Sequence, residues 1–171
     1  MRLFFGLKPA PHEALEIADW RSKSLPPLDH PVPAANLHIT LTFLGEVPER
    51  SLEVLVDEAG GIRNAPLRLT LDELGYWPRP RILWIGPRSV PQTATTLARA
   101  TASAARRAGL RPEKRDWTPH VTLARRCRLA PPAGAIAPAF KISFEAFCLF
   151  ESVRTRAGQR YDVVAEFPLT A

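Results

Sequence analysis

The sequence feature that most constrains the fold is a short pattern that occurs twice. The segments His38-Ile39-Thr40-Leu41 and His120-Val121-Thr122-Leu123 share the pattern His-x-Thr-x and begin 82 positions apart, so one copy falls in each half of the chain. Aliphatic and β-branched residues around both copies predict β-strands. Because side chains alternate between the two faces of a strand, each histidine shares a face with its threonine, and the aliphatic pair is buried behind them.

Two such strands carry what is needed to cleave a phosphodiester. If the two halves pack face to face, His38, Thr40, His120 and Thr122 converge on one small volume. The unperturbed pKa of histidine, about 6.5, lets one ring accept a proton from water while the other donates a proton to the leaving oxygen. Threonine hydroxyls can donate to the non-bridging phosphate oxygens, where negative charge accumulates in the transition state.

A structural role and a metal site are the competing interpretations of these histidines. One His-x-Thr in a strand is usually structural, but two copies at matching places favour catalysis in a chain with only four histidines. His12 and His30 lie at a helix start and in a proline-rich loop, where exposed structural roles suffice. Neither His38 nor His120 has a carboxylate or a cysteine within three residues to complete a coordination set, so we expect no metal.

The rest of the chain predicts an α+β domain. Apolar or alternating segments predict strands at 2–7, 37–44, 67–74, 81–85, 117–124, 140–150 and 161–167. Amphipathic or alanine-rich segments predict helices at 13–23, 48–59 and 92–108, and turn-forming residues predict loops at 75–80, 130–138 and 154–160. Runs of adjacent strands favour antiparallel sheets over a doubly wound parallel sheet. A chain of 171 residues can form one domain, or two small lobes that share a cleft.

The charge balance suits a polyanionic partner without proving one. The net charge is +6, and 19 of the 23 basic residues are arginine, whose planar fork matches phosphate. The same bias can reflect genomic base composition. No apolar run approaches the length of a membrane span, and the first residues read as a strand rather than as a signal peptide. We therefore expect a cytoplasmic protein with no membrane partner, in which Cys127 and Cys148 are small buried residues.

The motifs and their flanks resemble a known superfamily. Segments 36–45 and 119–125 are similar to the two motifs of the two-histidine phosphoesterases, and most similar to those of the RNA 2′,3′-cyclic phosphodiesterases, also called 2′-5′ RNA ligases. The resemblance extends to segments 2–5 and 81–86 and to the arginine-rich final hairpin. It implies a single domain over residues 1–171, with two pseudo-twofold-related lobes around a central cleft, each an antiparallel sheet with helices outside.

The same resemblance implies an activity and residue roles. The reaction is hydrolysis of an RNA 2′,3′-cyclic phosphate to a 2′-phosphate and a free 3′-hydroxyl, without a cofactor, and its reverse forms a 2′-5′ linkage. His38 is implied as the proton donor and His120 as the proton acceptor, with Thr40 and Thr122 beside them. Arg125 matches an arginine that helps to hold the phosphate.

For two of the candidate residues, the alternation of side chains along a strand predicts the face opposite to that of the histidine. Strict alternation turns Arg125 away from His120 unless the strand ends or bulges near Ala124; otherwise Arg125 is a solvated charge. Phe43 has the same problem relative to His38, so a core position is favoured for Phe43 and base stacking is the alternative. The hairpin residues Arg154, Arg156 and Arg160 either contact the RNA backbone or are solvated loop charges.

The sequence is also compatible with two other functions. One is a phosphodiesterase for a small cyclic nucleotide or a 2′-5′ oligonucleotide, and another is an RNA-binding module without catalysis. A module has no need of two titratable groups in opposite halves, which disfavours it. The basic loops favour RNA over a small nucleotide, and we expect a monomer.

Overall fold

A computed structural model describes residues 1–132 and 136–171, which form an α+β fold of nine strands, three α-helices and two short 3-10 helices. The strands are β1 (Arg2–Leu7), β2 (Ile39–Glu46), β3 (Leu67–Leu71), β4 (Glu73–Trp77), β5 (Ile82–Gly86), β6 (Val121–Ala124), β7 (Phe140–Phe144), β8 (Ala146–Thr155) and β9 (Gly158–Pro168). The helices are α1 (Pro11–Ser24), α2 (Leu52–Gly60) and α3 (Gln92–Arg107), with η1 (Ala34–Asn36) and η2 (Glu49–Ser51).

The main sheet consists of two antiparallel halves that meet at one residue pair. Its strand order is β4-β5-β6-β2-β1-β8-β9, and β3 and β7 form a separate antiparallel pair. The two halves meet between β2 and β6, where the register consists of the pair Ile39 and Val121. The expected α+β fold with antiparallel sheets is therefore confirmed, and the two motif strands are neighbours at its centre.

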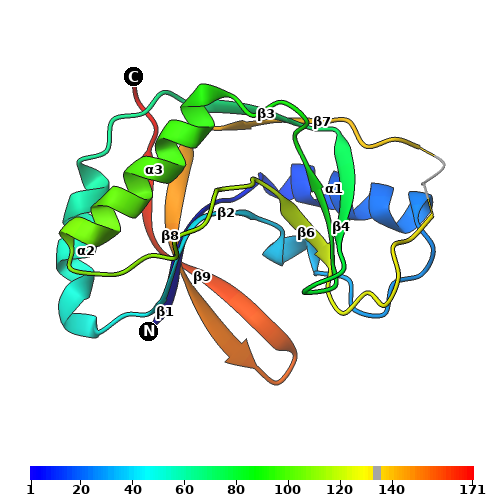
Figure 1. Ribbon diagram of the computed structural model, residues 1–171, viewed down its shortest axis with the longest axis horizontal. Coiled ribbons are helices and arrows are strands. Elements are labelled where there is room, and N and C mark those ends of the chain that lie inside the picture. Colours follow the sequence, from blue (N-terminus) through cyan, green and yellow to red (C-terminus); the bar gives the residue numbers. More distant parts are fainter. Residues whose placement is uncertain (133–135) are drawn as a thin grey trace.

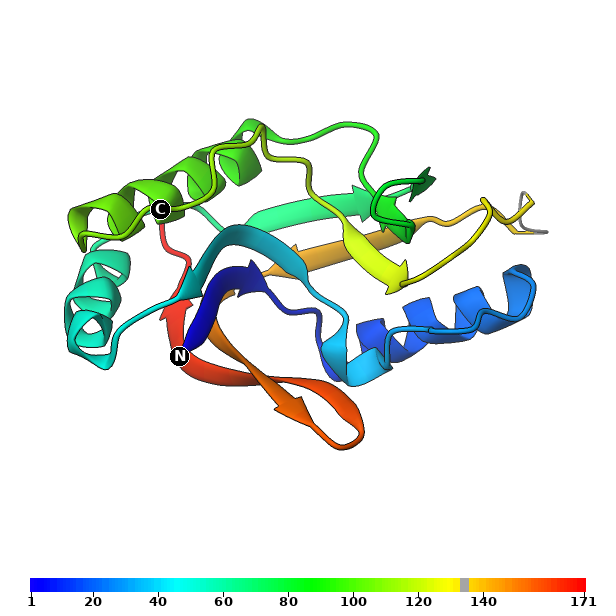
Figure 2. The ribbon, with the colours of Figure 1, turned by 60° about the horizontal axis from the view of Figure 1, so that its bottom comes forward.

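The helices lie outside the strands, at opposite ends of the molecule. Helices α2 and α3 pack together at one end and α1 lies at the other (Figures 1 and 2). The buried residues of α3 include Ala94, Leu97, Ala98 and Thr101, which recur at helical spacing on one face. Thr101 shares a hydrogen bond of 2.8 Å with the hydroxyl of Thr42, which fixes α3 to β2.

Residues 3–7 of β1 form an apolar run that is buried between neighbouring strands. It pairs with β2 on one side and with β8 on the other, and Leu3, Phe5 and Leu7 are fully buried. A strand with two neighbours in a covered sheet reads as a continuous apolar run, which is the pattern of residues 3–7.

Several local predictions were wrong. The predicted strand 140–150 is two strands, β7 and β8, which part at Glu145 and enter different sheets. The predicted strand 67–74 likewise divides at Asp72 into β3 and β4, which belong to different sheets, and the predicted strand 117–124 begins only at Val121. The predicted loop 75–80 begins only after Trp77, because Gly75 lies within β4: a Cβ at Gly75 would lie 2.1 Å from the ring of Trp84, so the glycine makes room for an indole. The predicted loop 154–160 is mostly strand, and only residues 156–157 separate β8 from β9.

The predicted loop 130–138 includes residues 133–135, which lie outside the described residues. Within residues 1–132 and 136–171, every helix is too short or too polar to cross a membrane.

Candidate active site

The pairing of Ile39 with Val121 aligns the two motifs in opposite directions. His38 and His120 are the residues immediately before β2 and β6. Because the strands are antiparallel, the register places Thr40 across from His120 and Thr122 across from His38. All four side chains line one cavity of about 370 Å³. The structure thus brings together the four residues that the repeated pattern predicted.

Each histidine ring is held by the carbonyl group two residues before it. The Nδ1 atom of His38 lies 2.7 Å from the carbonyl oxygen of Asn36, and that of His120 lies 2.8 Å from the carbonyl oxygen of Thr118. A carbonyl oxygen only accepts, so Nδ1 carries the proton in both rings and Nε2 is left for proton exchange. The Nε2 atom of His38 lies 3.1 Å from the hydroxyl of Thr40, which donates to it when His38 is neutral.

Aromatic rings enclose both histidines. The ring centroids of Phe4 and Tyr161 lie 4.9 and 4.8 Å from that of His38, and the centroid of Trp77 lies 4.6 Å from that of His120. Sequence reasoning missed these residues. All three lie in strands, but the pattern of a strand does not say which strands are its neighbours. The only indication in the sequence was the predicted burial of segment 2–7, which contains Phe4.

Burial keeps both rings neutral. Burial lowers the pKa of His38 to about 4. The hydrogen bond to the carbonyl of Asn36 raises this pKa, whereas repulsion from the charges of Arg125 and of a protonated His120 lowers it further. Burial also lowers the pKa of His120, and the Thr118 carbonyl opposes this shift while Arg125 adds to it. Without an anion in the cavity, neither ring holds a second proton at neutral pH.

Arg125 reaches the cavity because β6 both bulges and ends just before it: Leu83 pairs with Ala124 but Trp84 pairs with Thr122, so Leu123 is an extra residue. Strand β6 stops at Ala124, the backbone N–H of Arg125 donates to the carbonyl oxygen of His30 at 3.0 Å, and Arg126 adopts a positive φ of 54°. The strict alternation that would turn Arg125 away therefore does not apply. Its side chain is exposed and lines the same cavity as His38 and His120.

The preference for a core position of Phe43 was wrong. Phe43 is 37% exposed and lines the cavity, with the guanidinium of Arg2 5.0 Å from its ring centroid. The register between β1 and β2 shifts: Gly6 faces Thr40 and Phe5 faces Thr42, so Leu41 is an extra residue. This bulge reverses the alternation and turns Phe43 to the face that carries His38.

The hairpin arginines stand apart from the cavity. Arg154, Arg156 and Arg160 are exposed and do not line it. Arg160 donates to both carboxylate oxygens of Asp162, at 2.8 and 3.0 Å, so its charge is already paired. The hairpin nevertheless touches the site, because the side-chain amide of Asn36 donates to the carbonyl oxygen of Gln159 at 2.8 Å.

One carboxylate, Glu113, lines the cavity with the histidines, and it is paired with Arg115. Among residues 1–132 and 136–171, no group of three or more histidine, cysteine, aspartate or glutamate side chains could hold a metal ion. Cys127 and Cys148 are free thiols; Cys148 is buried, whereas Cys127 is only partly buried.

Comparisons with known proteins agree with the duplicated architecture. A family model, the LigT-like phosphoesterases, matches the chain twice, over residues 8–84 and 85–161, so each match contains one His-x-Thr-x motif. The chain is 37% identical over 175 aligned residues to the RNA 2′,3′-cyclic phosphodiesterase of Escherichia coli, covering 99% of this chain and 97% of that protein.

Solved structures show the same fold. The crystal structure of E. coli LigT complexed with 3′-AMP has a TM-score of 0.89 and 36% identity, covering 99% of this chain and 98% of that one. A crystal structure of a protein from Thermus thermophilus has a TM-score of 0.82 and 26% identity, with the same coverage of both chains.

Proposed function

The chain belongs to the LigT-like phosphoesterases, and from that premise we propose that it is a metal-independent RNA 2′,3′-cyclic phosphodiesterase with His38 and His120 as its acid–base pair. The reaction opens the cyclic phosphate at the end of an RNA to a 2′-phosphate and a free 3′-hydroxyl. The observation that carries the proposal is that both histidine rings, two threonines and two arginines, Arg115 and Arg125, line a single cavity.

The two histidines divide the proton transfers. His120 takes a proton from water as the water oxygen attacks phosphorus, and His38 gives a proton to the departing 3′-oxygen. Both transfers use Nε2, since each Nδ1 is bonded to a backbone carbonyl. A second turnover needs only the return of one proton from His120 to His38 through solvent.

Arg125 and the two threonines would stabilise the phosphate. A cyclic phosphodiester carries one negative charge, which increases on the non-bridging oxygens as phosphorus becomes five-coordinate. The guanidinium of Arg125 can bind these oxygens, and the hydroxyls of Thr40 and Thr122 can donate to them. All three side chains line the cavity that holds the histidines.

Substrate binding must also prepare His38 to act as an acid. Burial lowers its pKa to about 4, and a neutral His38 cannot donate from Nε2. A bound phosphate anion opposes both the cost of burying a charged ring and the repulsion from Arg125, so it raises the pKa of His38. The proposed cycle therefore includes proton uptake when the cyclic phosphate binds.

The proposal extends to the partner, the setting and the assembly. Arg154 and Arg156 carry exposed charges on the hairpin that Asn36 links to the His38 segment, and this supports a role in binding the RNA chain beyond its cyclic end. Both catalytic histidines come from one chain, so a monomer is sufficient. Free thiols and an RNA substrate fit a cytoplasmic enzyme.

The decisive experiment identifies the product. An RNA with a 2′,3′-cyclic phosphate end is incubated with the purified protein, and the end group is determined by mass spectrometry and by its sensitivity to phosphatase. We expect a 2′-phosphate, and no product with the His38→Ala/His120→Ala double variant. A 3′-phosphate, or activity confined to free cyclic mononucleotides, would overturn the assignment.

A further inference from the structure

A buried arginine on α1 has no part in the proton transfers or the phosphate contacts described above. Arg21 is 8% exposed, and it follows Ala14 and Ile17 at helical spacing on the buried face of α1. In the part of the chain that the structure describes, no carboxylate forms an ion pair with it. Burial lowers the pKa of Arg21, because the guanidinium loses the solvation of its charge. An apolar side chain would fill this position without that cost, so the charge calls for a specific role.

The guanidinium of Arg21 joins two segments that are far apart in the sequence. Its Nη1 atom donates to the carbonyl oxygen of Val32 at 2.7 Å and to that of Leu123 at 2.8 Å. Val32 belongs to the proline-rich loop that follows α1, and Leu123 belongs to the motif strand β6. One nitrogen atom of Arg21 therefore ties this loop to the strand that carries Thr122.

Segment 30–32 of the loop lies beside the end of β6. The backbone N–H of Val32 donates to the carbonyl oxygen of Leu123 at 2.9 Å. The backbone N–H of Arg125 donates to the carbonyl oxygen of His30 at 3.0 Å. The residue between these two contacts is a proline, which has no N–H to donate. The end of β6 is thus attached to the loop by two backbone hydrogen bonds and by the guanidinium of Arg21.

This attachment acts on the part of β6 that gives Arg125 its direction. The bulge leaves Leu123 without a partner on β5, and the strand stops at Ala124. The carbonyl group of Leu123 is held instead by Arg21 and Val32. Without Arg21 a single backbone hydrogen bond would hold this carbonyl, so the direction in which the chain leaves β6 would be less fixed.

We propose that Arg21 is a positioning residue for hydrolysis, which acts through Arg125 by holding the end of β6 against segment 30–32. The proposal rests on the proposed function, in which Arg125 binds the phosphate. Arg21 itself does not line the cavity that holds the histidines. Its effect on the reaction should therefore disappear when the side chain of Arg125 is removed, whereas an effect on folding alone would persist.

A double-mutant cycle tests this dependence. Arg21→Met removes both hydrogen bonds but keeps a long side chain that favours a helix. Hydrolysis of an RNA with a 2′,3′-cyclic phosphate end is measured for Arg21→Met, Arg125→Ala and the double variant. We expect Arg21→Met to lower kcat/KM about tenfold in the otherwise intact protein, as for the loss of hydrogen bonds to a charged group, but less than about twofold when residue 125 is alanine. Equal losses in both backgrounds overturn the proposal, because Arg21 would then only stabilise the fold.

The ionisation of the two catalytic rings gives a second readout, which needs no turnover. The charged groups that line the cavity with these rings are Arg125 and the paired residues Glu113 and Arg115. Repulsion from Arg125 lowers the pKa of both rings, so Arg21→Met should raise these pKa values, as Arg125→Ala does, and should add nothing in the double variant. NMR titration measures the shifts even if the protein hydrolyses nothing and the proposed function fails. Unchanged pKa values in Arg21→Met overturn the proposal.

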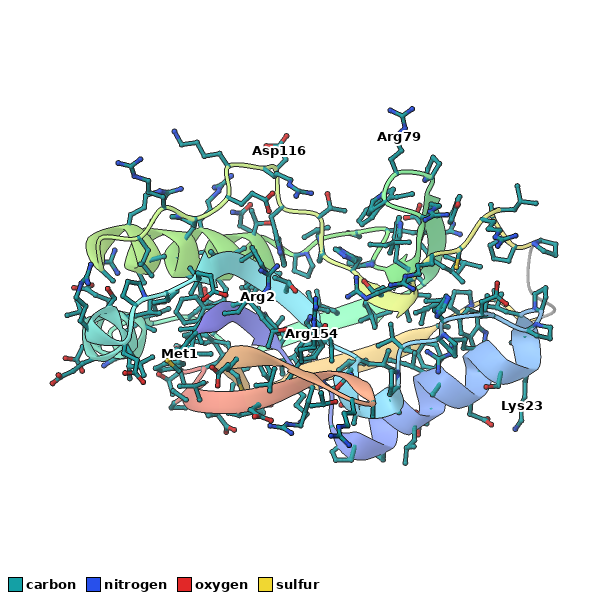
Figure 3. The ribbon with its side chains drawn as sticks, turned by 90° about the horizontal axis from the view of Figure 1, so that it is seen from below. Met1, Arg2, Lys23, Arg79, Asp116 and Arg154 are labelled. Atoms are coloured by element: carbon teal, nitrogen blue, oxygen red, sulfur yellow. The ribbon has the colours of Figure 1, made fainter. Side chains whose placement is uncertain are left out.

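Lys23→Met is the matched control. It removes a cation from the same helix, but Lys23 is exposed, pairs with Asp19, and projects from α1 away from the strands (Figure 3). It should leave kcat/KM and both histidine pKa values unchanged. If Arg21→Met does not fold, Arg21→Lys, which keeps a cationic donor, is used in the same cycle. A loss in Arg21→Lys that persists without Arg125 equally overturns the proposal.

Discussion

The ring of Tyr161 stands at 74° to the ring of His38, with their centroids 4.8 Å apart. Tyr161 belongs to the final hairpin and His38 to the opening of β2, so a residue far along the chain helps to keep the first histidine away from water. Their contact links the hairpin to the ionisation of His38, the proposed catalytic acid.

Opening this contact should raise the pKa of His38. Replacing Tyr161 with serine admits water to the ring, and the pKa of His38 should move from about 4 toward the ordinary value for histidine. Titration of the histidine ring signals by NMR measures this shift, with the signal assigned from the His38→Ala variant. Tyr161→Phe keeps the ring and should keep the low pKa, and equal values in Tyr161→Ser and the intact protein would show that Tyr161 does not shield His38.

Replacing either His38 or His120 with alanine should lower turnover of a cyclic phosphate RNA by about 10² to 10⁴, or roughly 3–5 kcal/mol of barrier. In the proposed mechanism the two rings act in one step. The double variant should therefore raise the activation free energy by much less than the sum of the two single increases. Steady-state kinetics on the three variants, with folding checked by circular dichroism, measures this. Near-normal turnover in one well-folded single variant contradicts a paired mechanism.

The pH profile should be bell-shaped and lie on the acid side of the reference value for histidine. The profile of kcat/KM reports the free enzyme, in which burial lowers the pKa of His38 to about 4 and also lowers that of His120. The acid is lost as pH rises and the base is lost as pH falls, so the maximum lies below about pH 6.5. The bound phosphate raises both pKa values, so the kcat profile should move to higher pH. Superimposable profiles would contradict proton uptake on binding.

Activity should survive the removal of metal ions. The cavity is lined by two histidines, two threonines, two arginines and one carboxylate, Glu113, which is paired with Arg115. Within the described residues, no group of three or more histidine, cysteine, aspartate or glutamate side chains could hold a metal ion. The rate is compared before and after dialysis against EDTA. Loss of activity that one divalent ion restores would contradict the mechanism.

The hairpin arginines should affect long RNA more than short substrates. Replacing Arg154 and Arg156 with alanine should weaken binding of long RNA and flatten its salt dependence, because each phosphate that is neutralised adds to the slope. Arg160 should contribute less, since it is paired with Asp162. Affinity is measured over a series of salt concentrations, beside hydrolysis of a cyclic mononucleotide. An equal loss on both substrates would place these arginines at the reacting phosphate.

The sequence was informative wherever the evidence was local. Most strands and helices follow from alternation, apolar runs and turn residues, and the four motif residues follow from a pattern repeated on two strands. The predictions that failed concern features that depend on a partner strand. The bulge at Leu41 that exposes Phe43 arises in the register between β1 and β2, and no feature of residues 37–44 alone specifies it.

The other errors have the same origin. Gly75 is a frequent turn residue, and its place in β4 is explained by Trp84 on the neighbouring strand. The break at Glu145 exists because β7 and β8 have different partners, although the sequence on both sides is equally strand-like. Which strands become neighbours is a property of the assembled fold.

The position of β1 in the main sheet has a consequence for how the protein is made. β1 leaves the ribosome before the other eight strands, yet one of its two neighbours is β8, which follows it by more than 130 residues. Until β8 has been synthesised, one edge of the apolar β1 has no native partner, and an open edge of this kind invites pairing with other chains. We therefore expect that slowing translation before β8 increases aggregation more than slowing it afterwards.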